Sequence, residues 1–386
     1  MFDAIVVGLG GMGSATLYHL ARRGLQVLGL EQFSIPHVFG SSHGLTRIIR
    51  LAYCESPKYV PLLRRSYELW NELQVEADEP LLHITGNIDA GWDGSRTVSG
   101  SLEACREHAL EFELLTARQL HARHPGYELP PGMTAVFQPQ GGLLVPERCV
   151  MAQVDRARQA GATVVENEVV LGWEASSNGA RVRTASTTHV AARLVITAGP
   201  WARRLVPALF EFAVPERQVV MWSEVEDNSM FSVDRFPVFN LQVSHDDSER
   251  YYGYPIHGRP GFKIGRYNHR KQRGHPEDLS RHVDNEDEAI LRSAVRRFFP
   301  KANGRTLATE TCLFTNTPDE HFILDHLNGL PNVAVAAGFS GHGFKFCSVV
   351  GEIMTDLVME GESRFDLGMF SAARFSSPPS AHEPRG

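Results

Sequence analysis

Three glycines near the N-terminus have the spacing of a phosphate-binding turn. Gly8, Gly10 and Gly13 form a G-x-G-x-x-G pattern directly after the apolar run 4–7. The first glycine allows a tight turn, the second lets a pyrophosphate approach the backbone, and the third lets the next helix pack on the strand. The start of that helix offers free N–H groups and a positive dipole to phosphates. Glu31 ends the next predicted strand and can accept ribose hydroxyls, so the unit predicts FAD or NAD without choosing between them.

Cationic side chains form a second group of candidates. Arg47 and Arg50 follow a glycine- and serine-rich loop and flank two isoleucines. If this run is helical, Thr46, Arg47 and Arg50 lie within one turn and can converge on one spot. A solvated basic face of a helix explains the spacing equally well. Lys345 stands at the mouth of another strand–glycine loop–helix unit, 333–359, where a cation and a helix dipole can stabilise an anion.

The elements around these residues predict an α/β protein. Helices are predicted at 14–23, 59–74, 101–115, 146–160, 287–299 and 347–359, and a further one starts at the cap Thr116. Strands are predicted at 4–7, 26–30, 84–90, 135–138, 163–165, 169–170, 180–184, 194–198, 310–315, 322–325 and 333–337. The strand at 194–198 ends in a turn with Gly199 and Trp201, which suits a strand whose end touches the nucleotide. The strand-rich stretch 214–265 predicts an antiparallel sheet that holds a substrate, and the tail after about Arg364 is expected to be loose.

Composition limits the class of protein. With 386 residues and a hydrophobic fraction of 42%, the chain is long enough for two domains. A net charge of −7 argues against general nucleic-acid binding, and no apolar run is long enough to predict a membrane span. Five scattered cysteines without a C-x-x-C pair, and a start without a secretion signal, predict a cytoplasmic protein. The histidines show no metal-binding spacing, and we interpret His121 and His124 as surface residues.

Three stretches carry a resemblance to a known family. They are Ser42 to Arg50 (SHGLTRIIR), Thr311 to Phe322 (TCLFTNTPDEHF) and Gly338 to Phe346 (GFSGHGFKF). With the N-terminal glycine pattern and Lys263, they resemble the monomeric sarcosine oxidase family, which includes N-methyltryptophan oxidase, over nearly the full length. The resemblance favours FAD over NAD. It implies a discontinuous, Rossmann-like FAD-binding domain of the glutathione-reductase type (1–83, 143–213 and 308–386) and an antiparallel-sheet substrate domain (84–142 and 214–307).

The resemblance also implies how the cofactor is held. Cys312 matches a cysteine that tethers FAD through a thioether, whereas on its own it would be interpreted as an ordinary buried thiol. His43, Thr46 and Arg47 match residues near the flavin on the side away from the substrate. The full set of implied cofactor-binding residues is Gly8, Gly10, Gly13, Glu31, Ser42, His43, Thr46, Arg47, Val169, Gly199, Trp201, Cys312, Gly341, Gly343, Phe344 and Lys345.

Four residues are implied to serve the substrate and oxygen. Lys345 and Arg50 match a pair that clamps a substrate carboxylate, in which arginine gives a two-pronged contact and lysine a point charge. Lys263 matches a lysine credited with oxygen activation, a reduction that a fixed cation favours electrostatically. The plainer alternative for Lys263 is a snorkelling side chain. Tyr252 matches a tyrosine of the substrate pocket.

The activity implied by the resemblance is the oxidation of a secondary amino acid with a free carboxylate, such as sarcosine or another N-methylated amino acid. Hydride passes to the flavin, the imine hydrolyses, and O₂ reoxidises the flavin to give H₂O₂. An N-methyl substrate also yields formaldehyde and the demethylated amino acid. A monomer that acts on a small-molecule substrate is expected.

Departures from the family pattern leave the substrate open. Tyr267 stands where the family has a pocket histidine, with His269 two positions further on, and Phe314 replaces a pocket tyrosine. The alternatives are therefore a cyclic-imino-acid oxidase (pipecolate- or proline-like) and a primary-amine oxidase resembling glycine oxidase. Two more distant alternatives are an NAD-linked dehydrogenase and a flavin-binding module without catalysis.

Overall fold

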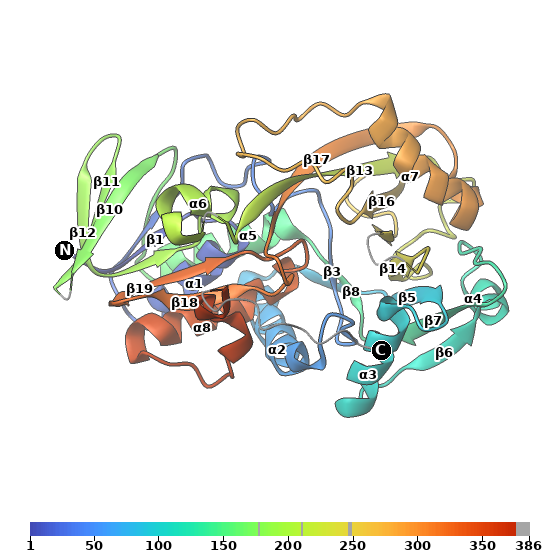
Figure 1. Ribbon diagram of the computed structural model, residues 1–386, viewed down its shortest axis with the longest axis horizontal. Coiled ribbons are helices and arrows are strands. Elements are labelled where there is room, and N and C mark those ends of the chain that lie inside the picture. The colour runs from blue at the N-terminus through green and yellow to red at the C-terminus, as the bar shows by residue number, and fades with distance from the viewer. Residues whose placement is uncertain (177, 210, 246–248, 376–386) are drawn as a thin grey trace.

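The computed structural model describes residues 1–386 with the exception of 177, 210, 246–248 and 376–386. One large sheet, at the left of Figure 1, has the strand order β10-β11-β12-β1-β2-β9, with β19 pairing β12 and β18 pairing β19. Its strands are β1 (Phe2–Val7), β2 (Val27–Leu30), β9 (Thr163–Val165), β10 (Val170–Ser176), β11 (Gly179–Thr184), β12 (Thr188–Ile196), β18 (Ile323–Leu327) and β19 (Leu330–Ala337). β1 is parallel to both β2 and β12, and β12 is parallel to β19, which is the arrangement of a nucleotide-binding sheet.

The second large sheet lies at the right of Figure 1 and has the order β17-β13-β16-β15-β14-β5-β7-β6. Its strands are β5 (Asn87–Trp92), β6 (Glu113–Thr116), β7 (Met133–Gln138), β13 (Val214–Ser223), β14 (Val238–Gln242), β15 (Arg250–Tyr254), β16 (Phe262–Arg266) and β17 (Thr306–Asn316). All neighbours except β14 and β5 are antiparallel. A small sheet of β3 (Arg47–Ile49), β8 (Gly142–Leu144) and β4 (Leu82–Ile84) lies where the chain passes between the two.

Several of the helices begin or end at residues that favour a helix terminus. They are α1 (Gly11–Arg22), α2 (Val60–Ala77), α3 (Arg96–Glu107), α4 (Ala117–Arg123), α5 (Pro146–Gln159), α6 (Ala202–Leu205), α7 (Asn285–Phe298) and α8 (Cys347–Glu360). Thr116 and Gln119 form a capping box at α4, Pro146 opens α5, and Gly361 ends α8 in the left-handed conformation. Among the described residues, no helix is both long and apolar enough to cross a membrane.

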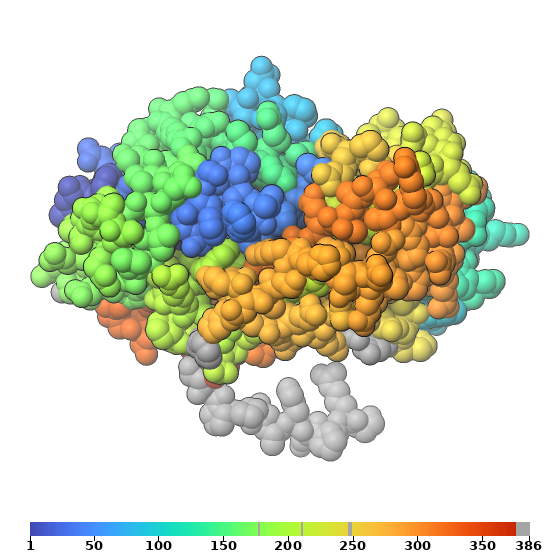
Figure 2. Space-filling view, turned by 90° about the horizontal axis from the view of Figure 1, so that it is seen from above, coloured from blue at the N-terminus to red at the C-terminus, as the bar shows by residue number. Residues whose placement is uncertain are grey.

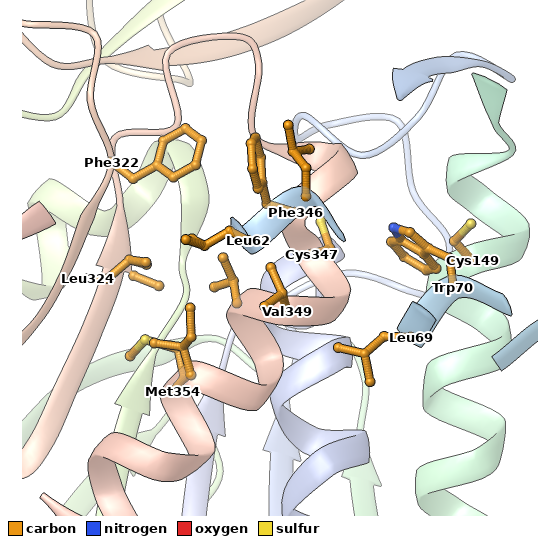
Figure 3. Packing of buried hydrophobic residues seen from close by; sticks show 14 of the residues in the cluster. Leu62, Leu69, Trp70, Cys149, Phe322, Leu324, Phe346, Cys347, Val349 and Met354 are labelled. Atoms are coloured by element: carbon orange, nitrogen blue, oxygen red, sulfur yellow. The ribbon is translucent and has the colours of Figure 1, made fainter. Parts of the chain in front are cut away.

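A single apolar cluster joins the helices that cover one face of the nucleotide sheet. α1 packs against α5 and α8, and α2 packs against α8. Figure 3 shows Trp70 of α2 beside Cys149 of α5, and Phe346 and Cys347 at the start of α8 in the same cluster. Full burial of a large apolar side chain contributes roughly 1.5–3 kcal/mol. This packing fixes the start of α8, and with it Lys345, relative to the glycine turn at α1.

Most predicted elements are present, but several differ. The run 46–50 is the strand β3 rather than a helix, because its isoleucines pair with β8 across the small sheet. The predicted helix 101–115 starts earlier and ends at Glu107, and its last residues belong to β6. The predicted strand 84–90 divides into β4 and β5. The tail is not entirely loose, since Phe370 is fully buried; the part from 376 lies outside the described residues. The expected domain boundary at 308 falls within β17.

Candidate active site

A long cavity connects the two large sheets. Its empty space, counted with the part open to solvent, is about 1870 Å³. Its lining includes the glycine turn with Glu31, the thiol of Cys312, and a region with Tyr252, Tyr267 and Lys345. Figure 2 shows the loop before β3, in blue, beside the segment before α7, in gold, and Arg281 of that segment donates to the carbonyl of Phe39 at 2.6 Å.

The glycine turn has the form that a dinucleotide needs. Gly8 has φ +88°, and a Cβ on Gly13 would lie 1.8 Å from the carbonyl oxygen of Gly8, so neither position accepts a side chain. A Cβ on Gly10 would meet only the Ser42 hydroxyl, at 3.5 Å, because this glycine faces the cavity. The open space over Gly10 and the free start of α1 therefore fit a pyrophosphate.

Glu31 is held in place at the end of β2. Its Oε2 accepts a hydrogen bond from the backbone N–H of Leu9 at 2.7 Å, and its Oε1 accepts one from Phe33 at 3.1 Å. Burial raises its pKa, and these hydrogen bonds act in the opposite direction. The carboxylate lines the cavity with acceptor capacity left over, as ribose hydroxyls require.

Most of the residues expected to form the site line this one cavity. They are Gly8, Gly10, Glu31, Ser42, His43, Arg47, Gly199, Trp201, Tyr252, Lys263, Cys312, Gly341, Gly343, Phe344 and Lys345. Gly13 and Thr46 lie directly behind the wall. Val169 does not line the cavity, although Glu168 and Val170 on either side of it do. Arg50 also stands behind the wall.

Lys263 is buried on the cavity side of β16. Its Nζ donates to the carbonyl of Gly44 at 2.5 Å and to the hydroxyl of Thr46 at 2.9 Å. The ammonium group also lies 4.6 Å from the ring centre of Tyr254 and 5.1 Å from that of Trp222. Burial, together with the charge of Arg47, holds its pKa well below the usual value. A snorkelling side chain does not fit, because only 2% of the residue is exposed.

Cys312, on β17, faces the cavity beside two cations. Burial raises the pKa of its thiol, while the charges of Arg47 and Lys263 favour the thiolate. The Arg47 guanidinium is fixed by the carbonyls of Thr46 and Ser41, both at 2.8 Å. His43 lines the same wall, and neither of its ring nitrogens has a partner among the described residues. Burial and the charge of Arg47 lower its pKa to about 3, so the ring is neutral at pH 7.

Lys345 and Arg50 come together although they are far apart in the sequence. Lys345 Nζ donates to the carbonyl of His342 at 2.7 Å and lies 5.1 Å from the ring centre of Tyr53; the Arg50 guanidinium lies 4.7 Å from that ring. Burial and the charge of Arg50 lower the pKa of Lys345 to about 7. Neither cation faces bulk water, since Lys345 is 4% and Arg50 1% exposed. Arg50 donates through Nη2 to Glu55 at 2.9 Å and through Nε to the carbonyl of Ala52 at 3.0 Å.

Several residues of this end were not expected from the sequence. Glu55 is buried between Arg50 and Arg250, 2.9 and 3.9 Å away, and these charges hold its pKa below the usual value although burial alone would raise it. His342 accepts a hydrogen bond from Tyr53 at 2.5 Å. The one available signal was that His342 lies inside the glycine-rich loop before Lys345.

His269 does not reach the cavity. Its Nε2 lies 3.1 Å from Asp287 in a buried cluster with Arg217, on the far side of the sheet from Tyr267. His269 therefore stabilises this buried cluster and has no contact with the cavity, although it lies only two residues after Tyr267. Among the described residues, no group of three or more His, Cys, Asp or Glu side chains is arranged to hold a metal ion.

The fold and the cavity define a class of flavoprotein. The chain belongs to the FAD dependent oxidoreductase family, whose model matches residues 3–357. It is 40% identical over 378 residues to the monomeric sarcosine oxidase of Bacillus sp. (strain NS-129), with 97% of each chain covered. It is 33% identical over 377 residues to the N-methyl-L-tryptophan oxidase of Yersinia pestis, with 97% of this chain and 99% of the relative covered. The resemblance noted in the sequence is confirmed, and FAD rather than NAD is the cofactor of the family.

The fold also agrees with solved structures of more distant proteins. NikD, an amino acid oxidase of nikkomycin biosynthesis, superimposes with a TM-score of 0.83 at 23% identity, over 96% of this chain and 97% of NikD. At this identity the likeness establishes the fold, and the substrate has to be argued from the cavity.

Proposed function

We propose that the protein is an FAD-dependent oxidase of secondary amino acids, with N-methylated amino acids as its substrates. The observation that carries the proposal is the pair of buried cations Lys345, which lines the cavity, and Arg50, which lies behind its wall. Buried cations need an anionic partner, and Lys345 has only a carbonyl and a hydroxyl within reach. A substrate carboxylate supplies that partner. The names of the relatives that match over nearly the whole chain, sarcosine oxidase and N-methyl-L-tryptophan oxidase, support the same class.

When bound, FAD supplies the acceptor for a hydride equivalent from the carbon beside the substrate nitrogen and passes the electrons to O₂, which gives H₂O₂. The protein's own contribution is to orient the substrate and to balance charge. Lys345 holds the carboxylate, with the charge of Arg50 behind it, and Tyr252 and Tyr267 form an aromatic wall beside it, with ring centres 5.0 Å apart. Water is excluded by these rings, so the amine is presented in a largely apolar space.

Lys263 is proposed to serve the reaction with oxygen. It is a cation fixed by the Gly44 carbonyl and the Thr46 hydroxyl on a different wall from Lys345. A positive charge held in a buried site stabilises negative charge that develops on O₂ far better than the same charge in water. Lys263 therefore serves the reaction with oxygen, and Lys345 binds the substrate.

A covalent link between Cys312 and FAD is a further part of the proposal. It is supported by the place of the thiol in the middle of the cavity and by Arg47 and Lys263, whose charges favour the thiolate. The yellow colour is expected to precipitate with the acid-denatured wild-type protein. In Cys312→Ala it should stay in the supernatant. Release of the flavin from the wild type would refute the link without affecting the proposed activity.

The activity is tested by anaerobic titration of the flavin absorbance. Sarcosine and other N-methyl amino acids should bleach the flavin, and hydrolysis of the imine should give formaldehyde. Admission of O₂ should restore the flavin absorbance with release of H₂O₂. Sarcosine amide, which lacks the carboxylate, is the matched control and should fail to bleach. Proline, pipecolate and glycine are tested as well. If only these bleach the flavin, the protein is instead an oxidase of cyclic imino acids or of primary amines.

We also propose that the protein acts as a monomer in a reducing compartment. All five cysteines are buried and unpaired, which is usual in cytoplasmic proteins. Gel filtration of the flavin-loaded protein should give the mass of one chain, about 43 kDa.

A further inference from the structure

A third buried cation, Arg250, stands near the substrate end of the cavity. It opens β15, in which alternate residues point to the same side of the sheet, so Arg250 shares its side with Tyr252 and Tyr254. Both tyrosines line the cavity. The Arg250 guanidinium lies 4.8 Å from the ring centre of Tyr267, another lining residue, and the arginine is only 6% exposed. Arg250 therefore stands directly behind the aromatic wall.

The guanidinium of Arg250 is poorly satisfied. Its Nη2 reaches Glu320 at 3.5 Å, its Nη1 lies 3.9 Å from Glu55, and its buried Nε has no partner among the described residues. Glu320 is itself a weak partner, because its side chain is 34% exposed and also lies 3.6 Å from Arg96. An arginine carries five N–H donors in a rigid fork, so Arg250 has donors to spare for an incoming acceptor.

Arg50 and Arg250 both face the carboxylate of Glu55, but Glu55 lies closer to Arg50. Glu55 binds Arg50 at 2.9 Å with one oxygen and faces Arg250 at 3.9 Å with the other. The two guanidinium groups are thus separated by little more than one carboxylate. A molecule with two carboxylates a few carbons apart can therefore place one on Lys345, in front of Arg50, and direct the other toward Arg250.

The wall in front of Arg250 is also where the chain departs from the family pattern. Tyr267 takes the place of a pocket histidine and Phe314 that of a pocket tyrosine, and their ring centres are 6.0 Å apart. The Tyr267 ring lies 4.8 Å from the Arg250 guanidinium, a distance that favours a stacked arginine. Tyr267, one of the residues that leave the substrate open in the sequence, thus lies next to Arg250.

We propose that Arg250 is a specificity-determining residue that binds a second acidic group, and that the preferred substrates are short N-methylated dicarboxylic amino acids. The inference rests on the proposed function, since it names the substrate class of the same site. Because Arg250 stands behind Tyr267, the Tyr267 ring turns aside on binding, and the side-chain carboxylate of the substrate then replaces Glu320, which turns toward solvent. A long or aromatic side chain would leave the buried donors of Arg250 without an acceptor, and a neutral one would not compensate its charge.

The test compares isosteric substrates on the flavin-loaded enzyme. N-methyl-L-glutamate and N-methyl-L-glutamine differ only in the charge of the side chain, and N-methyl-L-aspartate tests the length. We expect kcat/KM for N-methyl-L-glutamate to exceed that for N-methyl-L-glutamine about 10-fold or more. In Arg250→Met, kcat/KM for the acid should fall about 100-fold, mainly through KM, whereas that for the amide should change less than about threefold.

A matched control and separate readouts keep the outcomes distinct. Arg266→Met removes an arginine from the opposite side of the same hairpin, where Arg266 lies 5.9 Å from the Tyr251 ring, and should leave the acid-to-amide ratio unchanged. If Arg250→Met fails to fold, the acid-to-amide ratio of the wild type tests the inference, together with Arg250→Lys, which keeps the charge but loses the two-pronged contact. Equal rates with acid and amide would overturn the inference and leave the oxidase intact. If no N-methyl amino acid bleaches the flavin, the proposed function itself fails.

Discussion

The pKa of Lys345 gives a sharp prediction about carboxylate binding. Burial and the nearby charge of Arg50 lower this pKa to about 7, so the lysine changes its charge within the range in which the enzyme can be assayed. A carboxylate binds the ammonium form, and the amine form offers no charge. Affinity is therefore full below pH 7 and is lost as the pH rises through 7, until the raised pKa of the complex is reached.

The size of the change in affinity follows from the fraction of Lys345 that is protonated at each pH. Each pH unit above a pKa of 7 weakens binding about tenfold, or about 1.4 kcal/mol, which gives roughly a 100-fold rise in Kd between pH 6 and pH 9. The ligand should be a simple carboxylate without an amine, such as propanoate, because the substrate amine itself gains reactivity as it loses its proton. Perturbation of the flavin absorbance reports Kd directly.

Two variants separate Lys345 from other titrating groups. Lys345→Arg keeps a charge that does not titrate, so its Kd should be constant from pH 6 to pH 9. Lys345→Met should bind weakly at every pH. A wild-type Kd that stays flat over this range, or that improves at pH 9, would show that Lys345 does not hold the carboxylate.

Three further predictions follow from the same site. Lys263→Met should slow flavin reoxidation by O₂ about 100-fold, as measured by stopped flow, and leave anaerobic reduction by substrate nearly unchanged. Gly13→Ala places a Cβ 1.8 Å from the Gly8 carbonyl and should abolish flavin loading, whereas Gly172→Ala, whose Cβ would meet only Arg183 at 3.8 Å, should keep the normal flavin-to-protein ratio. Glu55→Gln removes a charge that raises the pKa of Lys345, so the loss of propanoate affinity should move to lower pH in the same titration.

The elements that the sequence predicts well are those with local signals. The unit of β1, α1 and β2 is specified by three glycines and an apolar run, and α5 by a proline at its first turn. The Thr116 cap of α4 also forms as predicted, and Gln119 completes it as a capping box. Each signal lies within a few residues of the element that it specifies.

The elements that the sequence predicts poorly depend on distant partners. The strand at 47–49 forms because β8, almost a hundred residues later, offers free backbone groups beside it. β6 pairs with β7 and so interrupts what looks like a longer helix. Hydrophobic periodicity does not distinguish a strand from a helix over such short runs, since pairing across the sheet decides the outcome.

The residues of the site also differ in how well the sequence predicts them. Residue types and the family pattern point to Lys345, Lys263 and Cys312, and all three line the cavity. Glu55 and Arg250 give no signal in the sequence, because nothing in their spacing shows that one carboxylate lies between two guanidinium groups. Such charge networks are assembled from separate loops and strands and become visible only in three dimensions.

The distribution of charge in the cavity explains why this acidic chain gathers its cations there. The net charge is −7, yet Arg47, Lys263 and Lys345 all line one buried space, with Arg50 and Arg250 behind its wall. Buried charges of one sign destabilise a fold unless something compensates them. Glu55 and Asp89 lie beside Arg50, and Glu147 and Glu310 lie close enough to Lys263 to compensate part of its charge. Among the described residues, no carboxylate forms a hydrogen bond with Lys345, so the carboxylate of the substrate adds to this compensation, and the positive charge in the cavity lining indicates where it binds.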